Sequence, residues 1–447
     1  HSSGFVTLGN IRKRQPKGDF TKDPMNLVTV PAVSRNLHVI LLKNYETARK
    51  IAESSPYNFT DGCGTLGVIC NGVSYNYVSD ALEDLNATDR IKVLRIGFSH
   101  PLPEAPIKDF LKGCEKILVV EEGEPFLEEA VKAIAQEAQL TLPIRGKSKE
   151  LFSRLYEYDP AMVKTNIAGY FEISGHSTQP VDTSDVPTLL QRPPTLCAGC
   201  SHRATFYEVR EAAKALGVET IYPTDIGCYT LGLLPPHSAA DFLICMGSSV
   251  GTAGGFSKVT DKKVIAFIGD STFFHSGIPG LINAVFNNHN FTLVILDNGT
   301  TAMTGHQPHP GVDMQQLQMD GFGRVSIEAV VIAVGVPHVT VVKPYKVKKS
   351  IEAIRAAIDF EGVSVIISQE TCALYAKSLK LARRKPFEVT DKCRNHRDCM
   401  DNLACPAFYV WNERIKIDPN LCTGCAVCAQ ICPENAILPR KEKTVTA

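Results

Sequence analysis

The distribution of cysteines constrains this chain more than any other feature of its sequence. Seven of its fifteen cysteines fall within forty positions near the C-terminus, and two more form a separate Cys-x-x-Cys pair. From about residue 385 the composition changes to Cys, Pro, Asn and Arg, with no apolar segment long enough for a core. In a chain without a secretion signal, such clustering favours metal or iron–sulfur ligation over disulfides. We therefore expect a tail held together by an inorganic group, in a reducing, anaerobic compartment.

The last four cysteines follow the C-x2-C-x2-C-x3-C-P spacing of bacterial ferredoxins. They are Cys422, Cys425, Cys428 and Cys432, and Pro433 comes next. Three thiolates at this spacing curl round one corner of a cubane, and in two-cluster ferredoxins the fourth crosses to the other cluster. Zinc, the main alternative, prefers ligands in two separated pairs. The spacing therefore favours iron–sulfur ligation.

The upstream half of this pattern is incomplete. It offers Cys393, Cys399 and Cys405, so that seven thiols are available where two four-iron clusters need eight ligands. The crossing rule groups Cys405 with Cys422, Cys425 and Cys428, and leaves Cys393, Cys399 and Cys432 for the second cluster. The eighth ligand stays open between His396, Asp398, Asp401, a three-iron cluster and an open iron site. A single cluster with three spare thiols is a further alternative.

The rest of the chain alternates runs rich in β-branched residues with helical segments, which predicts parallel sheets covered by helices on both faces. One such series lies within residues 36–178 and a second within 195–384. Residues 1–35 and the Pro-rich stretch 179–194 are expected to be linkers. The expected strands are 38–42, 67–70, 91–96, 117–120, 264–268, 292–296, 339–342 and 363–368. The expected helices are 77–85, 106–114, 127–138, 204–216, 244–258, 278–287, 327–334 and 348–360.

Charge and hydropathy argue against nucleic-acid and membrane partners. Among the 447 residues, Lys plus Arg and Asp plus Glu both number 47, so the formal net charge is zero and no global attraction to anionic polymers is expected. No run approaches the roughly 20 apolar residues of a membrane-spanning helix, and the first residues lack a signal-peptide pattern. We expect a soluble, cytoplasmic protein.

Polar side chains follow two of the expected strands. Asp270, within Gly269-Asp270-Ser271, comes after strand 264–268, and Asn298 comes after strand 292–296. Because the carboxyl ends of parallel strands share one edge of a sheet, these side chains should meet there. Their oxygens suit Mg²⁺, which bridges to a diphosphate, and Thr300 in the following loop can add a backbone carbonyl. The predicted cofactor-binding residues are Asp270, Ser271, Asn298 and Thr300.

This Gly-Asp and Asn arrangement is the thiamine-diphosphate signature, and residues 296–310, Leu-Asp-Asn-Gly-Thr-Thr-Ala-Met-Thr-Gly-His-Gln-Pro-His-Pro, resemble the large subunit of indolepyruvate ferredoxin oxidoreductases. Segments 197–203, 225–229 and 269–277 and the ferredoxin-type tail agree, so the resemblance covers nearly the whole chain. It implies an α/β fold with two doubly wound parallel-sheet domains. These are a transketolase C-terminal-like domain at 36–178 and a thiamine-diphosphate-binding domain at 195–384, in which Asp270 and Asn298 bind Mg²⁺. A bacterial ferredoxin-like [4Fe–4S] domain follows at 385–447.

The resemblance also implies a third cluster beside the thiamine. Related 2-oxoacid ferredoxin oxidoreductases hold one at the positions of Cys197, Cys200, Cys228 and Cys372, where zinc or reduced thiols are the alternatives. Cys228 is expected to end the first strand of the second series, and Cys372 to follow its last strand. Five histidines lie in loops predicted near the cofactor: His202, His237, His275, His306 and His309. Of these we select His275 and His306 as catalytic candidates, because they follow the loops of Asp270 and Asn298.

By resemblance, the activity is the oxidative decarboxylation of an aryl 2-oxoacid such as indolepyruvate to acyl-CoA and CO₂. Thiamine diphosphate carries the chemistry, and electrons leave through [4Fe–4S] clusters to ferredoxin. A smaller second subunit completes the enzyme. Family members begin with a pyrimidine-binding domain, and this chain is expected to start after it, so that domain is either truncated or on another polypeptide. The alternatives are an electron-transfer or structural subunit of such a complex, or a non-redox thiamine-dependent decarboxylase, which would not need the cysteine-rich tail.

Overall fold

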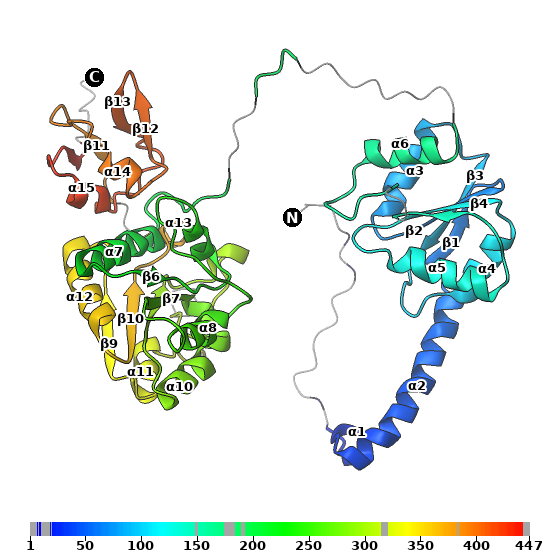
Figure 1. Ribbon diagram of the computed structural model, residues 1–447, viewed down its shortest axis with the longest axis horizontal. Helices are drawn as coiled ribbons and strands as arrows, with labels where there is room; N and C mark the ends of the chain where they lie inside the picture. The colour runs from blue at the N-terminus through cyan, green and yellow to red at the C-terminus, as the bar shows by residue number, and fades with distance from the viewer. Residues whose placement is uncertain are drawn as a thin grey trace. The chain divides into compact units, whose positions relative to one another are not determined.

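The computed structural model describes residues 20–147, 151–173, 184–188, 193–313, 321–381 and 384–440, together with Thr7, Gly9 and Gly18. The chain divides into two compact units, residues 1–188 and 189–447, coloured blue to green and green to red in Figure 1. The division falls within the Pro-rich stretch 179–194. The predicted domain boundaries themselves stay predictions.

The first unit contains a five-stranded sheet in the order β1-β3-β2-β4-β5. Its strands are β1 (Asn58–Asp61), β2 (Leu66–Asn71), β3 (Ile91–Ile96), β4 (Lys116–Val120) and β5 (Ile144–Arg145). Strands β2 to β5 pair in parallel, and β1 runs antiparallel to β3 at the edge. The strands predicted at 67–70, 91–96 and 117–120 are confirmed as β2, β3 and β4. They read as continuous apolar runs because both faces of the sheet are covered.

Helices cover both faces of this sheet, as predicted. In one core, α3 (Ser74–Asp84) and α6 (Pro160–Tyr170) pack against it, and in the other, α4 (Glu104–Lys112) and α5 (Phe126–Glu137) do. Successive residues of β2 alternate between the two cores, with Val68 and Cys70 in the first and Ile69 in the second.

The strand predicted at 38–42 is wrong. These residues lie within the long helix α2 (Pro31–Glu53), which the short helix α1 (Pro24–Leu27) precedes. Pro31 occupies the first helical turn, where its missing N–H costs nothing, and Arg49 forms ion pairs with two glutamates one turn away on either side. A short apolar run does not distinguish strand from helix, so these flanking signals decide.

The second unit contains a five-stranded, all-parallel sheet in the order β6-β7-β8-β10-β9. Its strands are β6 (Thr220–Ile221), β7 (Lys263–Gly269), β8 (Phe291–Asp297), β9 (His338–Val342) and β10 (Val363–Gln369). The chain leaves β8 for the edge strand β9 and returns to β10 between them, so the strand order reverses beyond β8. Open α/β sheets bind ligands at the carboxyl ends of strands near such a reversal.

Both faces of this second sheet are also covered by helices (Figure 1). On one face lie α8 (Ser248–Phe256), α10 (Ile278–Phe286) and α11 (Ile327–Ala333), and on the other α7 (Ser201–Leu216) and α12 (Val347–Asp359). The predicted doubly wound architecture is therefore confirmed. Short segments complete the loops: η2 (Cys228–Leu233), α9 (Asp270–Thr272), the π-helical η3 (Phe273–Gly277), η4 (Ala302–Thr304) and α13 (Ala373–Ser378).

The cysteine-rich tail forms a small ferredoxin-like part of the second unit. Its strand β11 (Phe387–Val389) pairs with β14 (Ile437–Pro439), and β12 (Phe408–Trp411) pairs with β13 (Arg414–Ile417), both antiparallel. Two short helices carry cysteines between these strands: α14 (Asp398–Asp401) lies between β11 and β12, and α15 (Val427–Ile431) lies between β13 and β14. Its apolar cluster includes Ala204 of α7 and Val347 of α12. The tail thus completes its core against the α/β layers.

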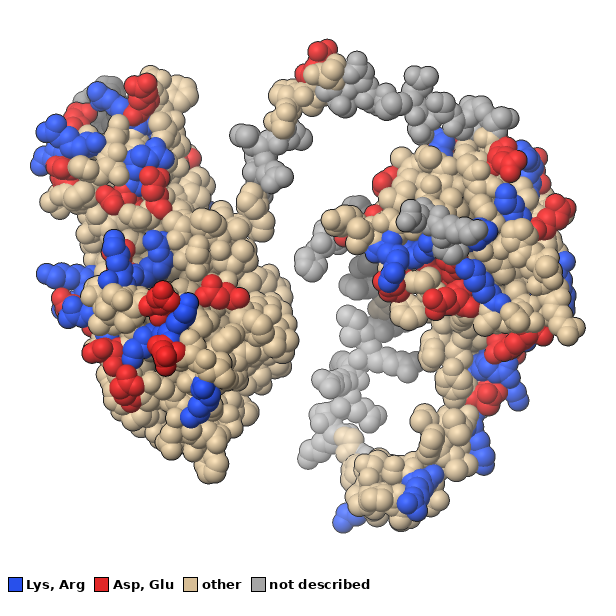
Figure 2. All heavy atoms as spheres, in the orientation of Figure 1, with Lys and Arg blue, Asp and Glu red and all other residues tan. Residues whose placement is uncertain are grey.

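No helix in the described part of the chain is long and apolar enough to span a membrane. On the face that Figure 2 shows, Lys and Arg side chains are interspersed with Asp and Glu over both units. This mixture accords with the equal numbers of acidic and basic residues, 47 of each.

A buried carboxyl group on α7 predicts a pH-dependent stability. Glu208 is 0% exposed, and burial raises its pKa well above the ordinary value. The folded state therefore holds this proton more tightly than the unfolded state, whose Glu ionises from about pH 4.3 upward. Stability should fall as pH rises through that value, until the folded-state pKa is reached.

Accordingly, Glu208→Gln should raise the melting temperature, and the gain should grow between about pH 4.5 and neutral pH. Glu352→Gln, at an exposed position of α12, is the matched control and should change little. Calorimetry across this pH range would contradict the assignment if the Glu208→Gln gain were the same at every pH.

Candidate functional site

Two side chains meet at the carboxyl edge of the second sheet, where the sequence predicted them. Asp270 follows β7 and Asn298 follows β8, and these strands pair in parallel up to Gly269 and Leu296. The Oδ2 atom of Asp270 accepts hydrogen bonds from the backbone N–H groups of Asn298 and Gly299, at 3.0 and 2.8 Å. Both side chains are buried, with 3% of Asp270 and 6% of Asn298 exposed. The acid and the amide are therefore fixed side by side.

Asp270 keeps capacity for a cation. A carboxylate offers about four lone-pair positions. Two of them, on Oδ2, take the backbone N–H groups just described, and Ser271 N donates to Oδ1 at 2.7 Å. One position on Oδ1 remains. Thr300 is 2% exposed, and its buried Oγ1 has no hydrogen-bond partner among the described residues. Buried polar atoms left without partners mark a place for a polar ligand, and these oxygen donors fit Mg²⁺ and a diphosphate.

A histidine that the sequence did not single out contacts Asn298. Asn298 Oδ1 accepts from Thr300 N at 3.1 Å, so its other terminal atom is the amide nitrogen, which lies 3.2 Å from His202 Nε2. An amide nitrogen only donates, so Nε2 accepts and the proton of His202 sits on Nδ1. Burial lowers the pKa of His202 to about 4, although Asp270 opposes the shift. His202 is therefore neutral, with a buried Nδ1–H that has no partner in the described residues.

A second histidine, His309, lies against Asp270. Its Nε2 is 3.0 Å from Asp270 Oδ2, an ion-pair distance without hydrogen-bond alignment, and its Nδ1 accepts from Gly311 N at 3.1 Å. The sequence placed both His202 and His309 among the loop histidines but gave no reason to prefer them. Sequence patterns could not distinguish these two histidines, because each contacts a residue at least 39 positions away in the chain.

The two histidines selected from the sequence, His275 and His306, lie away from Asp270 and Asn298 in their described contacts. His275 is exposed on η3 and its Nδ1 contacts the adjacent Ser276 Oγ at 3.1 Å. His306 stacks on Tyr375, with ring centroids 5.3 Å apart, and has a buried Nδ1 without a partner among the described residues. Neither contacts Asp270 or Asn298 in any described interaction. Their catalytic roles stay predictions.

Four cysteines surround this edge of the sheet. Cys372 follows β10, and its backbone N–H donates to Asn298 O at 2.9 Å. Cys197 and Cys200 precede α7, with Cys200 at its N-cap. Burial, and next the neighbouring Cys372 thiol, raises the pKa of both Cys197 and Cys228. The structure therefore brings these thiols together beside Asn298.

The expected position of Cys228 at the end of a strand is wrong. Strand β6 is only two residues long, Thr220–Ile221, and Cys228 instead begins the 3-10 helix η2. The chain between them is held by Asp225, whose buried carboxylate accepts from Ser249 N and Oγ at 2.8 and 2.7 Å and so caps α8. Strand-type pairing of Pro223 and this cap together set the path of the chain to Cys228.

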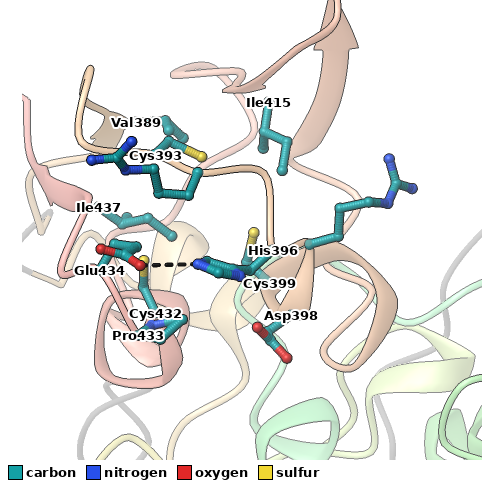
Figure 3. Close-up of a pocket in the computed structure, with 12 residues that line it drawn as sticks. Val389, Cys393, His396, Asp398, Cys399, Ile415, Cys432, Pro433, Glu434 and Ile437 are labelled. Carbon is teal, nitrogen blue, oxygen red and sulfur yellow. Dashed lines mark hydrogen bonds and ion pairs between the residues drawn. The ribbon is translucent and has the colours of Figure 1, made fainter.

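The C-terminal cysteines line two separate small cavities. One is lined by Cys405, Cys422, Cys425 and Cys428, and the other, shown in Figure 3, by Cys393, Cys399 and Cys432. This is the grouping that the crossing rule predicts. Among the described residues, no three His, Cys, Asp or Glu side chains converge as the ligands of one metal ion would. In a cubane, by contrast, each thiolate binds a different iron.

The loop of Cys197 and Cys200 packs directly on the loop of Cys422 and Cys425. A Cβ atom added to Gly199 would lie 1.8 Å from Thr423 Oγ1, so only glycine permits this approach. Ala198 and Gly199 also line the cavity of the C-terminal loop. Tyr345 Oη donates to Gly199 O at 2.6 Å. The cysteines near Asn298 and those of the first C-terminal cavity therefore belong to adjoining loops.

A buried arginine ties the start of the Cys197 loop to the segment that precedes Cys405. Arg203, 3% exposed, donates to the carbonyl oxygens of Leu196, Leu403 and Ala404. Burial lowers the pKa of Arg203, and the thiols of Cys405 and Cys200 oppose the shift most strongly. Its charge thus lies between thiols of both groups.

Three family models match the chain. A thiamine pyrophosphate enzyme C-terminal TPP binding domain matches residues 225–368, an indolepyruvate oxidoreductase domain matches 60–188, and a 4Fe-4S binding domain matches 415–438. The chain is also similar to three archaeal proteins, each called indolepyruvate oxidoreductase subunit IorA. Identity is 44% to that of Methanothermobacter thermautotrophicus, over 98% of this chain and 71% of the relative. It is 41% to that of Archaeoglobus fulgidus, over 99% and 71%, and 38% to that of Thermococcus kodakarensis, over 99% and 72%.

The close approach of the two cysteine loops can be tested with Gly199→Ala. The substitution adds a clash with Thr423 to the strain of a left-handed backbone, φ +67°. Gly217 has the same φ of +67° and nothing within 4 Å of an added Cβ, so Gly217→Ala measures the strain alone, about 1 kcal/mol.

We expect Gly199→Ala to lower the melting temperature of the anaerobically purified protein more than Gly217→Ala does. Adding Thr423→Ala should recover part of the difference, because it removes the clashing hydroxyl. Equal losses for the two glycine substitutions would show that the loops do not pack as described.

Proposed function

The chain belongs to the indolepyruvate oxidoreductase family, and we propose that it carries out the thiamine-dependent oxidative decarboxylation of an aryl 2-oxoacid of the indolepyruvate type. The proposed products are acyl-CoA and CO₂, with electrons passed through [4Fe–4S] clusters to ferredoxin. Coenzyme A is the proposed acyl acceptor. A smaller second subunit and a pyrimidine-binding domain are the proposed partners in the complete enzyme.

One observation carries this proposal: the carboxyl-edge site and the cysteine groups are in direct contact. Cys372 N donates to Asn298 O, and the loop that holds Gly199 packs on the loop that holds Thr423. A thiamine enzyme without redox chemistry has no use for thiols in this position. The contact supports a path for electrons from the diphosphate site to the ferredoxin-like part.

Each residue at the carboxyl edge of the second sheet would make a different contact with the cofactor or its metal ion. Asp270 and Asn298 would hold Mg²⁺ with their side-chain oxygens, and the Thr300 loop would add a further oxygen. Thiamine diphosphate, when bound, supplies the carbanion-stabilising chemistry of the decarboxylation. The neutral His202 holds the Asn298 amide by accepting from its nitrogen, which leaves Oδ1 as the atom available to a cation. His309 faces Asp270 from the other side.

Three cluster sites are part of the proposal. Cys197, Cys200, Cys228 and Cys372 would hold a cluster beside the cofactor, and the two C-terminal cavities would each hold one. Arg203 lies between the first two sites, where its positive charge would offset the negative charge that thiolates and added electrons bring into a buried region. His306, next to the Asn298 loop, and His275 remain the proposed candidates for handling substrate protons.

The Mg²⁺ assignment can be tested with Asp270→Asn, which keeps the shape of the side chain and removes its charge. Calorimetric titration of the complex with Mg²⁺ and thiamine diphosphate should show affinity weakened by more than about 100-fold, since loss of an outer-shell partner alone costs up to that much. Asp261→Asn, at an exposed turn between α8 and β7, should bind as the unchanged protein does. Unaltered affinity in Asp270→Asn would remove this residue from the cofactor site.

The substrate class is tested on the complete complex under anaerobic conditions, with Mg²⁺, thiamine diphosphate and coenzyme A. Indolepyruvate should reduce a low-potential acceptor and yield the acyl-CoA, and pyruvate and 2-oxoglutarate should do so poorly. Aldehyde release without reduction of the acceptor would instead identify a non-redox decarboxylase. Clusters that dithionite reduces, without turnover of any 2-oxoacid, would identify an electron-transfer subunit.

A further inference from the structure

The incomplete upstream cysteine run has a histidine at the position of its missing ligand. In the complete run, Cys422, Cys425 and Cys428 are each three residues apart. The upstream run has Cys393, His396 and Cys399 at the same spacing. A closing Cys-Pro pair follows each, Cys432-Pro433 and Cys405-Pro406. His396 therefore stands where the complete run has Cys425.

The backbone of the two loops repeats this correspondence. Gly424 and Ala426, on either side of Cys425, have φ values of +74° and +64°. Asn395 and Arg397, on either side of His396, have φ values of +55° and +68°. Ala426 and Arg397 are also the N-caps of α15 and α14. Left-handed backbone costs a residue other than glycine about 1–2 kcal/mol, so two such residues beside His396 indicate that the loop conformation is required.

The side chain of His396 lines the same cavity as the three thiols that the crossing rule assigns to the second cluster. Cys393, Cys399 and Cys432 lie around it, and Figure 3 shows the His396 ring between Cys399 and Cys432, reaching toward Glu434. His396 Nε2 is 2.9 Å from Glu434 Oε1.

The two aspartates that the sequence left as alternatives are engaged elsewhere. Both carboxylate oxygens of Asp401 accept hydrogen bonds from Arg397, at 2.9 and 3.1 Å. Asp398 Oδ1 accepts from Asn402 Nδ2 at 2.9 Å, and Figure 3 shows this carboxylate turned away from the three sulfur atoms. His396 is therefore the best placed of the three candidates.

The contact with Glu434 also fixes which nitrogen of His396 can bind iron. A carboxylate only accepts hydrogen bonds, so the proton of a neutral His396 lies on Nε2 and the lone pair on Nδ1. Histidines that bind metals commonly donate their other N–H to a carboxylate in this way, which orients the ring and strengthens the ligand.

We infer that His396 is the fourth ligand, through Nδ1, of an iron–sulfur cluster held by Cys393, Cys399 and Cys432, with Glu434 as a positioning residue. A neutral imidazole in place of a thiolate removes one negative charge from the cluster. Replacement of Cys by His raises cluster reduction potentials in other proteins. The Cys393 cluster should therefore have a higher potential than the all-thiolate cluster of Cys405, Cys422, Cys425 and Cys428, and should collect the electrons that reach the ferredoxin-like part.

Pulsed EPR of the dithionite-reduced complex, prepared with ¹⁵N-histidine, tests the ligand directly. The unchanged protein should show coupling of one cluster to an imidazole nitrogen. His396→Cys should abolish that coupling and keep the iron content, and a potentiometric titration should show one cluster shifted to a more negative potential. His396→Ala should also abolish it and convert that cluster to a three-iron or open-site form. His38→Ala, at an exposed position of α2 in the other unit, should leave spectra and potentials unchanged.

Glu434→Gln tests the positioning role. An amide can turn either its oxygen or its nitrogen toward His396, so the ring is held less firmly and iron retention should fall while the nitrogen coupling persists in the clusters that remain. Absence of imidazole coupling in the unchanged protein, or its survival in His396→Cys, would overturn the assignment. Because dithionite replaces the 2-oxoacid as electron source, this result is independent of whether the proposed substrate is turned over.

Discussion

The contact between Gly199 and Thr423 is the interaction on which the rest of the arrangement depends. It joins two cysteine loops that are more than 200 residues apart in the chain, and no side chain larger than hydrogen fits between them. Arg203, 3% exposed, adds a second link between these parts of the chain, because it donates to the carbonyl oxygens of Leu196, ahead of Cys197, and of Leu403 and Ala404, ahead of Cys405. These bonds pair the terminal nitrogens and offset much of the cost of burying a guanidinium, while its buried Nε has no partner among the described residues.

The parallel sheet explains why the chemistry gathers at one edge. Strands β7, β8 and β10 are neighbours and run in the same direction, so Asp270, Asn298 and Cys372, which follow them, share one edge. Helix α7 begins at the same edge and adds Cys200 and His202 from its first turn. The site is thus assembled from chain segments that are distant in sequence, because the ends of these strands and the start of the helix lie at the same edge of the sheet.

The ferredoxin-like part completes its apolar core against the neighbouring helices. Its buried cluster includes Cys399 and Cys428 themselves, together with Ala204 and Val347 from the helices beneath it. Hydrogen bonds from Val347 N to Gln430 Oε1 and from Gln430 Nε2 to Tyr345 O fasten α15 to the start of α12. In the proposed enzyme, cluster ligation and apolar packing would use the same residues, so cluster binding and folding of this part would be coupled.

Sequence patterns suffice to predict the doubly wound architecture, the division of the C-terminal cysteines and the meeting of Asp270 with Asn298. Each follows from a local pattern: alternation of elements, ligand spacing, or a polar residue at a strand end. The helix over 38–42 escaped prediction because a short apolar run suits either conformation, and the signals that favour a helix, Pro31 and the ion pairs of Arg49, lie outside that run. Only the tertiary fold shows that His202 contacts Asn298, that His309 contacts Asp270, and that His396 faces Glu434. These contacts join residues between 38 and 96 positions apart, and spacing patterns carry no information about partners that only the packing of helices and loops brings together.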